Sequence, residues 1–257
     1  MDEFTSTGAP LTTAGFDAAL QILGASPEAL WSALNVETSG CGYLSDRRPK
    51  ILFERHYFHR LTGGKYDASH PEVSNPSAGG YGAGGAHQYG RLAQALQLDR
   101  AAALQSASWG LGQIMGANYA SAGFIDVEDM VKAFVSGEDA QLEGIARFVG
   151  GSPMKAALQK MDWAAYARLY NGPSYAENNY DTRLSAAFAR FTMSGCPDLD
   201  VRAAQVCLTY LGYDTGGIDG IVGPKTTKAL AAFQAKAGIA PADGSVNAAT
   251  LEALRAA

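Results

Sequence analysis

Apolar residues recur at helical spacing, at positions i, i+3 and i+4, along most of the chain. In the first such segment, 12–24, Phe16, Leu20 and Leu23 share one face and Gly24 ends the pattern. The spacing predicts a mainly helical protein, with helices at about 12–24, 26–40, 89–105, 127–135, 138–149, 153–160, 162–170 and 178–191.

One short stretch has the composition of a β-strand. Residues 50–54 lie in a run from Arg47 to Phe58 that is rich in β-branched and aromatic residues, so we expect a strand or hairpin arm there. The next region, 62–90, is dominated by Gly, Ser, Asn, Pro and Tyr, with five glycines in Gly79–Gly85. This composition predicts an irregular surface loop near a functional site, with a disordered connector as the alternative.

One glutamate continues the apolar face of the helix expected at 26–40. Leu30 and Leu34 mark that face, Glu37 is the next member of the series, and Gly40 is a suitable helix stop. Partial burial and the negative end of the helix dipole would both raise the pKa of such a carboxyl group. A raised pKa suits a general acid working near neutral pH. The periodicity alone fits equally well a glutamate that turns to solvent at a frayed helix end.

Composition and charge narrow the class of protein. The chain has 257 residues, of which 47% are hydrophobic and 18% charged, as expected for one large globular domain or two unequal ones. A net charge of −5 argues against a nucleic-acid partner. The three cysteines, Cys41, Cys196 and Cys207, show no pairing motif and are expected to be reduced thiols. The polar segment Met1–Leu11 lacks the apolar core of a signal peptide.

The last 59 residues contain an internal duplication. The segments 219–230 and 243–254 share the pattern Asp-Gly, Thr and Ala-Leu at a constant offset of 24 residues. Because one repeat is too small to bury a core alone, we expect the two to pack together. This tail has five basic and five acidic residues, so the net negative charge lies entirely in residues 1–198. It offers no catalytic constellation and is typical of a binding module.

The tail resembles a known family on five stretches, Val201–Gln205, Leu211–Tyr213, Gly217–Thr226, Phe233–Gln234 and Asp243–Gly244. The family is the common peptidoglycan-binding domain, a small three-helix module whose groove lies between the repeats. The resemblance implies ligand contacts at Tyr213, Asp219 and Gly220.

Three motifs in the first part of the chain, in the expected order, resemble those of lytic transglycosylases and goose-type lysozymes. Residues 36–40 (Val-Glu-Thr-Ser-Gly) resemble the Glu-Ser-x-Gly that ends the catalytic helix, 108–115 (Ser-Trp-Gly-Leu-Gly-Gln-Ile-Met) resemble Gly-Leu-Met-Gln-Ile, and 169–173 (Leu-Tyr-Asn-Gly-Pro) resemble Tyr-Asn-Ala-Gly-Pro. Residues 48–56 (Arg-Pro-Lys-Ile-Leu-Phe-Glu-Arg-His) are closer still to the phage-type N-acetylmuramidase family, so residues 11–191 are identified as similar to it. Gly112 departs from relatives that carry Met or Phe there.

These resemblances imply two domains. Residues 1–194 would form a mainly α, lysozyme-like α+β catalytic domain with a small β element, and residues 199–257 a three-helix all-α binding domain. A linker is expected at Ser194–Asp198, where Gly and Pro interrupt the helical pattern.

The implied chemistry is cleavage of the β-1,4 bond between N-acetylmuramic acid and N-acetylglucosamine in peptidoglycan. Glu37 is the expected general acid and Glu54 the expected second carboxylate, with Asp46 as a weaker option and a salt bridge to Arg55 or Arg47 as the alternative explanation of Glu54. Without a second carboxylate, the sugar 6-hydroxyl would attack, as in lytic transglycosylases.

The remaining site residues are expected to contact sugar or to pack in the core. The amides of Gln113 and Asn171 would bind N-acetyl groups, and Tyr170 and Tyr180 would line the cleft. Trp109, in a tight glycine-rich segment, is expected to be core rather than a sugar platform.

Two other enzyme classes use residues that this chain also contains. A zinc peptidase or amidase is suggested by four histidines, His56, His59, His70 and His87. However, a His-x-x-His pair is one residue short of the helical i, i+4 spacing of zinc ligands. Cys41 suggests a cysteine peptidase, although cysteine is also common as a small buried residue without a catalytic role. A non-catalytic wall-binding protein is the third alternative.

We therefore expect an endolysin that lyses cells, with peptidoglycan as its partner and no cofactor, metal, nucleic-acid partner or membrane insertion. It is expected to be a monomer that stays in the host cytoplasm until released to the cell wall.

Overall fold

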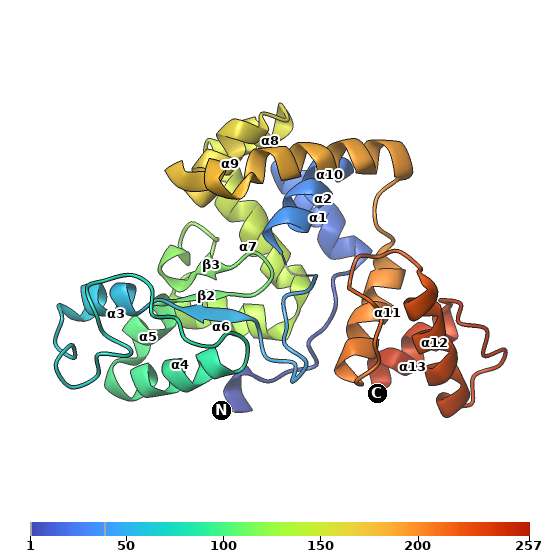
Figure 1. The fold of residues 1–257 in the computed structure, drawn as a ribbon, viewed down its shortest axis with the longest axis horizontal. Helices are drawn as coiled ribbons and strands as arrows, with labels where there is room; N and C mark the ends of the chain where they lie inside the picture. Colours follow the sequence, from blue (N-terminus) through green and yellow to red (C-terminus); the bar gives the residue numbers. More distant parts are fainter. Residues whose placement is uncertain (1, 39) are drawn as a thin grey trace. The chain divides into compact units, whose positions relative to one another are not determined.

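The computed structural model describes residues 2–38 and 40–257, with the side chains of Asp2, Glu37 and Ser174 outside that description. The chain divides into two compact units (Figure 1). Unit 1 comprises Met1–Gly8 and Gly42–Gly151, and unit 2 comprises Ala9–Cys41 and Ser152–Ala257. Each unit is therefore built from segments that are distant in the sequence.

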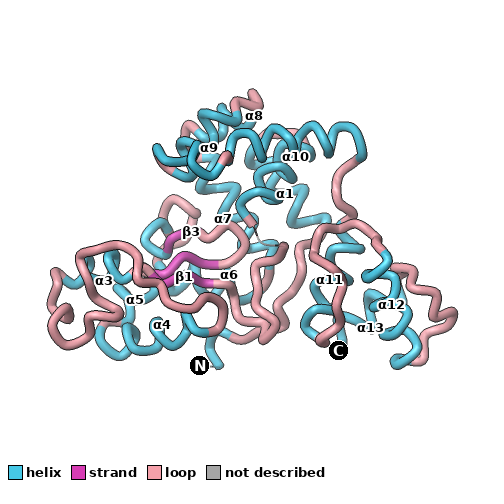
Figure 2. The backbone as a smooth tube through the Cα atoms, in the orientation of Figure 1, coloured by secondary structure: helices cyan, strands magenta, loops and turns pink. Residues whose placement is uncertain are grey.

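Unit 1 carries the β-structure of the described chain, a small antiparallel sheet with strand order β1-β2-β3 (Figure 2). Its register pairs Ile51 with Trp109 and Trp109 with Ile114. The helices of this unit are named with the strands in chain order: η1 (Asp2–Phe4), β1 (Ile51–Phe53), α3 (Arg55–Thr62), α4 (His87–Leu98), α5 (Arg100–Gln105), β2 (Ala107–Trp109), β3 (Ile114–Met115), η2 (Gly116–Asn118), α6 (Val127–Ser136) and α7 (Glu138–Gly150).

The core of unit 1 forms around Trp109, which is fully buried. Its ring lies 5.6 Å from the ring of Phe4, which in turn lies 5.7 Å from Tyr89. The indole N–H donates a 3.0 Å hydrogen bond to the Leu104 carbonyl, so the polar end of this large side chain is satisfied as burial requires. The expectation that Trp109 belongs to the core is confirmed.

The helices of unit 2 come from both ends of the chain. They are α1 (Thr13–Leu23), α2 (Pro27–Glu37), α8 (Met154–Gln159), α9 (Trp163–Asn171), η3 (Pro173–Asn178), α10 (Tyr180–Ser194), α11 (Leu199–Tyr210), α12 (Pro224–Ala237) and α13 (Ala248–Ala256). Helix α2 packs along α10, where Arg190 donates a 2.9 Å hydrogen bond to the Asn35 side chain. Phe16 stacks on Trp31 at 5.0 Å and joins α1 to α2.

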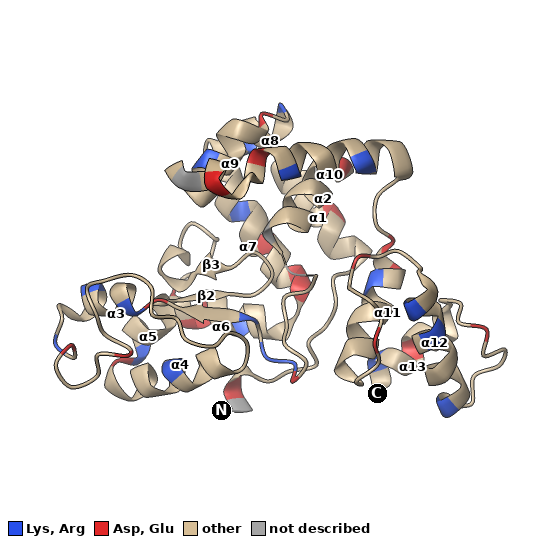
Figure 3. Ribbon diagram, viewed as in Figure 1, with Lys and Arg blue, Asp and Glu red and all other residues tan. Residues whose placement is uncertain are grey.

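The last three helices, α11 to α13, surround a core of their own. It contains Ala204, Leu208, Leu230, Phe233 and Leu254, all buried. The expected three-helix tail is confirmed. The domain boundary expected at Ser194–Asp198 stays a prediction, because Ser152–Ala257 belongs to a single compact unit together with Ala9–Cys41. Figure 3 shows basic residues on these helices and acidic residues both on the helices and on the loops that connect them.

Several local expectations need correction. Helix α2 ends at Glu37 with Thr38 as its C-cap, and not at Gly40. The single helix expected at 89–105 is two helices, because Asp99 adopts an extended conformation and caps α5 through the Ala102 N–H. His56 lies on helix α3, immediately after the strand, and the short strands β2 and β3 had no counterpart in the expected pattern.

Candidate active site

The two candidate catalytic carboxylates lie in different units, so we describe each with its own unit. Glu37 is the last residue of α2, as expected for an acid at a helix end. Its side chain lies outside the described residues. Glu54 follows β1 directly and precedes α3, where backbone hydrogen bonds fix its position: its N–H donates to the Ser106 carbonyl at 2.8 Å.

The Glu54 side chain does not stabilise the start of helix α3. It occupies the N-cap position of α3 but makes no capping hydrogen bond. Its Oε2 lies 3.1 Å from Nδ1 of His56, within ion-pair distance, yet the two atoms are buried and not aligned as a hydrogen bond. Its ion-pair partner is therefore His56, and not Arg55 or Arg47 as the alternative explanation supposed. A buried carboxylate oxygen without a hydrogen bond is unusual and calls for a functional explanation.

Asp46, the weaker candidate for the second acid, has both carboxylate oxygens occupied. The Arg48 guanidinium donates to Oδ2 from Nε at 3.0 Å and from Nη2 at 2.5 Å, and the Arg48 N–H donates to Oδ1. Partial burial opposes this effect, but the hydrogen bonds and charge of Arg48 hold the pKa of Asp46 below its usual value. Asp46 is thus committed to a local turn, and Glu54 remains the better candidate.

The glycine-rich segment Gly79–Gly85 is fixed by hydrogen bonds to neighbouring helix α4 and does not form a disordered connector. The side-chain amide of Gln88, 1% exposed, donates to the carbonyls of Tyr81 and Ala83 at 2.8 and 2.7 Å and accepts the Phe53 N–H at 3.1 Å. Arg91 donates to the Gly80 carbonyl at 2.8 Å. The segment is irregular, as expected, but one buried side chain joins it to the end of β1.

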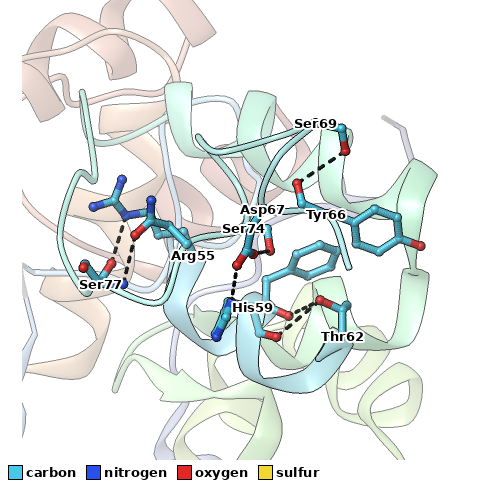
Figure 4. A network of polar contacts seen from close by, with 10 residues as sticks. Arg55, His59, Thr62, Tyr66, Asp67, Ser69, Ser74 and Ser77 are labelled. Carbon is cyan, nitrogen blue, oxygen red and sulfur yellow. Dashed lines mark hydrogen bonds and ion pairs between the residues drawn. The ribbon is translucent and has the colours of Figure 1, made fainter. Parts of the chain in front are cut away.

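A second polar cluster fixes the part of the 62–90 region that precedes the glycine-rich segment (Figure 4). Asp67 accepts from Ser74 Oγ at 2.6 Å and lies 2.8 Å from His59 Nδ1. Arg55 donates from Nε to the Ser77 carbonyl at 3.1 Å. The serine hydroxyl and the imidazole both bind the carboxylate and do not face one another, so the cluster is a structural clamp and no nucleophilic triad.

Gln113 is exposed, but its amide is used within the protein. Its Oε1 accepts from Ser108 Oγ at 2.9 Å, and its Nε2 donates to the carbonyls of Gly110 and Lys50 at 2.9 and 3.2 Å. Its φ of +50° lies in the left-handed region, which suits a tight turn between β2 and β3. To bind a sugar through its amide, Gln113 would have to give up one of these hydrogen bonds. A role for Gln113 in substrate binding stays a prediction.

The candidate substrate residues of unit 2 cluster around α9 and α10. Tyr170 stacks on Tyr166 with ring centroids 5.8 Å apart, and Asn171 ends the helix. Tyr180 opens α10, with the Arg183 guanidinium 5.4 Å from its ring. Unit 2 therefore contains three of the four expected substrate-binding residues, whose role stays a prediction.

In the tail, the three expected ligand residues have structural contacts. Asp219 Oδ1 accepts from Gln205 Nε2 and from the Ile221 N–H, and the Gly220 N–H donates to Gln205 Oε1 at 2.8 Å. Tyr213 packs edge-on against Phe233. A cavity of about 650 Å³ in this tail lies instead beside the second repeat and the starts of α11 and α13, with Asp198, Val222, Gly244, Leu251 and Arg255 in its lining.

Comparison with known families accounts for both parts of the chain. A model of the N-acetylmuramidase family matches residues 26–192, a range that contains Glu37 and Glu54. The chain belongs to the N-acetylmuramidase family. A second model, described as a putative peptidoglycan binding domain, matches residues 197–254. This muramidase is therefore a peptidoglycan-hydrolysing enzyme, with peptidoglycan as its substrate.

Among solved structures, the muramidase is similar to the Burkholderia AP3 phage endolysin. The two share 42% sequence identity with a TM-score of 0.68, over 73% of this chain and 72% of that chain. A comparison with curated proteins finds no match. The mainly α, lysozyme-like fold with a small sheet, expected from the sequence, is confirmed together with the helical binding domain.

The metal and thiol alternatives find little support in the described residues. No three His, Cys, Asp or Glu side chains gather there as a metal site would require. His56 and His59 lie on one helix, each beside its own carboxylate partner. Cys41 is buried, and none of the three cysteines forms a disulfide within the described residues. Within the described part of the muramidase, every helix is too short or too polar to cross a membrane.

Three residues of this site had no place in the expectations: His56 as the partner of Glu54, Gln88 as the clamp, and Tyr81 on the clamped loop. His56 could have been found by its position two residues after Glu54 once a helix, and not a strand, was placed there. Gln88 gave no signal, because a glutamine in an amphipathic helix is ordinarily exposed.

Proposed function

We propose that this muramidase hydrolyses the β-1,4 bond between N-acetylmuramic acid and N-acetylglucosamine, with Glu37 as general acid and Glu54 as second carboxylate. The observation that carries the role of Glu54 is its buried, unbonded Oε2 at the end of β1. A carboxylate that neither caps its helix nor pairs with an arginine is available to activate water or to stabilise an oxocarbenium-like transition state.

The resemblance of residues 36–40 to the end of a catalytic helix supports Glu37 as the acid. A carboxyl group at the C-terminal end of a helix meets the negative pole of the dipole, which favours its protonated form. Protonation of the glycosidic oxygen requires that form at the start of the reaction.

The separation of the two carboxylates would decide between retaining and inverting chemistry. A lytic transglycosylase, in which the sugar 6-hydroxyl displaces the leaving group, is the second candidate, favoured by the motifs shared with that class. The two candidates differ in whether Glu54 is needed.

The test is mass spectrometry of the soluble products from purified peptidoglycan, with Glu37→Gln and Glu54→Gln beside the wild type. Products ending in reducing N-acetylmuramic acid, lost in both variants, are expected. Anhydro-N-acetylmuramic acid ends, with Glu54→Gln still active, would establish the transglycosylase. Free peptides in place of glycan ends would overturn both.

We propose that α11–α13 hold the enzyme on its insoluble substrate and so raise the effective concentration of the active site there. Deletion of residues 199–257 should weaken sedimentation with cell-wall sacculi and slow their digestion while leaving a folded catalyst. A truncated protein that binds sacculi as well as the full chain would contradict this role.

We further propose that the protein acts as an endolysin, as the name of its structural neighbour suggests: a monomer that accumulates in the host cytoplasm and lyses the cell once it reaches the wall. Expression with and without an independent membrane lesion, followed by turbidity and fractionation, tests this. Lysis without a lesion would contradict the proposed location, and a dimer by light scattering the proposed monomer.

A further inference from the structure

The Gln88 side chain brings the backbone segments that carry Tyr81 and Glu54 together in unit 1. Gln88 Oε1 accepts the N–H of Phe53, the residue before Glu54, and Gln88 Nε2 donates to the carbonyl of Tyr81 itself. One buried side chain therefore fixes both residues relative to each other. A glycine-rich loop fixed in this way can hold a side chain accurately, whereas a free loop cannot.

The Arg55 side chain makes a second contact with the loop. The Arg55 guanidinium lies against Gly80, so close that a Cβ on Gly80 would be 2.7 Å from Arg55 Cζ. Gly80 also has a φ of +66°, which L side chains rarely adopt. The glycine before Tyr81 thus allows the loop to approach the residue after Glu54.

The electrostatics are consistent with a direct interaction. Burial, followed by the negative charge of Glu54 and a hydrogen bond to it, raises the pKa of Tyr81, so the phenol keeps its proton and can donate it to the carboxylate. Tyr81 is 36% exposed, so it lies at the protein surface and not in the core. The groups that interact with Glu54 include His56 from α3, Tyr81 from the loop and Arg91 from α4.

We propose that Tyr81 is a positioning residue for Glu54: its hydroxyl donates to the carboxylate, and together with His56 it holds the Glu54 side chain in one orientation. This inference rests on the proposed role of Glu54 as second carboxylate.

The test compares the kcat and KM of Tyr81→Phe with those of the wild type on soluble peptidoglycan fragments. We expect kcat to fall about tenfold with KM within about twofold. Tyr119→Phe is the matched control, because the Tyr119 hydroxyl makes no hydrogen bond among the described residues of the same unit. Thermal melting of each variant checks that it is folded.

Glu54→Gln, measured beside Tyr81→Phe, separates failure of this inference from failure of the proposed function. An active Glu54→Gln enzyme would overturn the role of Glu54 and this inference with it. An inactive Glu54→Gln enzyme beside a Tyr81→Phe enzyme with unchanged kcat would overturn the inference alone. A raised KM with unchanged kcat would make Tyr81 a sugar contact, which also overturns it.

Discussion

The Arg202 guanidinium donates a 2.8 Å hydrogen bond to the carbonyl oxygen of Gly40, three residues after Glu37. Arg202, on α11, is only 3% exposed, although arginine is among the residues least often buried. Ile218, from the same tail, lies beside Gly40: a Cβ on that glycine would be 3.2 Å from Ile218 Cβ. Within unit 2, the binding helices therefore contact the segment that follows the candidate acid.

This contact predicts that Arg202→Met destabilises unit 2. A charged donor to a carbonyl contributes about 1.5–3 kcal/mol to the free energy of unfolding, and methionine keeps the apolar volume but not the donor. Urea denaturation measures the loss. The control is Arg255→Met, because Arg255 is an exposed arginine in the same three-helix tail. Equal stability of the two variants would show that the Gly40 contact contributes nothing.

Gln88 gives the second prediction. Gln88→Leu keeps the approximate volume but leaves the Phe53 N–H and the carbonyls of Tyr81 and Ala83 without this partner. Unsatisfied buried groups cost about 1–3 kcal/mol each, and water reaching the loop reduces the total to about 2–4 kcal/mol. Hydrogen exchange at the Phe53 amide should speed up, because that amide loses its acceptor. Unchanged protection at Phe53 would contradict the clamp. Gln94→Leu, on the exposed face of the same helix, is the control.

Much of the helical fold follows from the sequence, because its helices carry local signals. Phe16 and Leu23 repeat at helical spacing, and Ser26 and Pro27 begin α2 with a cap and a preset φ. The 24-residue duplication likewise predicted that the tail would pack as one core. These features depend on neighbours close in sequence, which a pattern can record.

The site is less predictable, because its geometry depends on contacts between distant residues. Gln88 acts on Phe53, 35 residues away, and no spacing rule links them. The strand β2 is three residues long and is defined by its pairing with Ile51–Phe53, and not by its own propensity. The break at Asp99 was visible as an N-cap residue, but the apolar spacing on both sides concealed it.

The duplicated tail predicts an unequal effect of two equivalent glutamines. Gln205 binds Asp219, Gly220, Ile221 and Thr226, using both amide atoms. Gln234 makes the corresponding set in the second repeat with fewer bonds, to Gly244, Ser245 and Thr250.

Replacing either glutamine by leucine should loosen its loop, with the larger loss of stability for Gln205→Leu because more buried groups lose their partner. Thermal melting of the full chain, followed by sacculus binding, checks the order. A greater effect of Gln234→Leu would mean that the second repeat, and not the first, limits the stability of the tail.

Asp67 leads to a prediction about acid stability. The hydrogen bond from Ser74, and then the hydrogen bond and charge of His59, lower the pKa of Asp67. A carboxyl group whose folded pKa lies below its unfolded value, about 3.9 for aspartate, stabilises the fold above that pH. This contribution is lost as the pH falls through the folded pKa, so the clamp of Figure 4 weakens in acid.

Asp67→Asn, which cannot ionise, should therefore melt at a lower temperature than the wild type near pH 5, and the difference should shrink as the pH falls below about 3.9. Asp17→Asn, at an exposed position of α1, should show no comparable pH-dependent difference. Melting curves of the three proteins at half-unit steps of pH give the comparison. A difference that persists unchanged to the lowest pH would show that Asp67 stabilises the loop through its shape and neutral hydrogen bonds, and not through its charge.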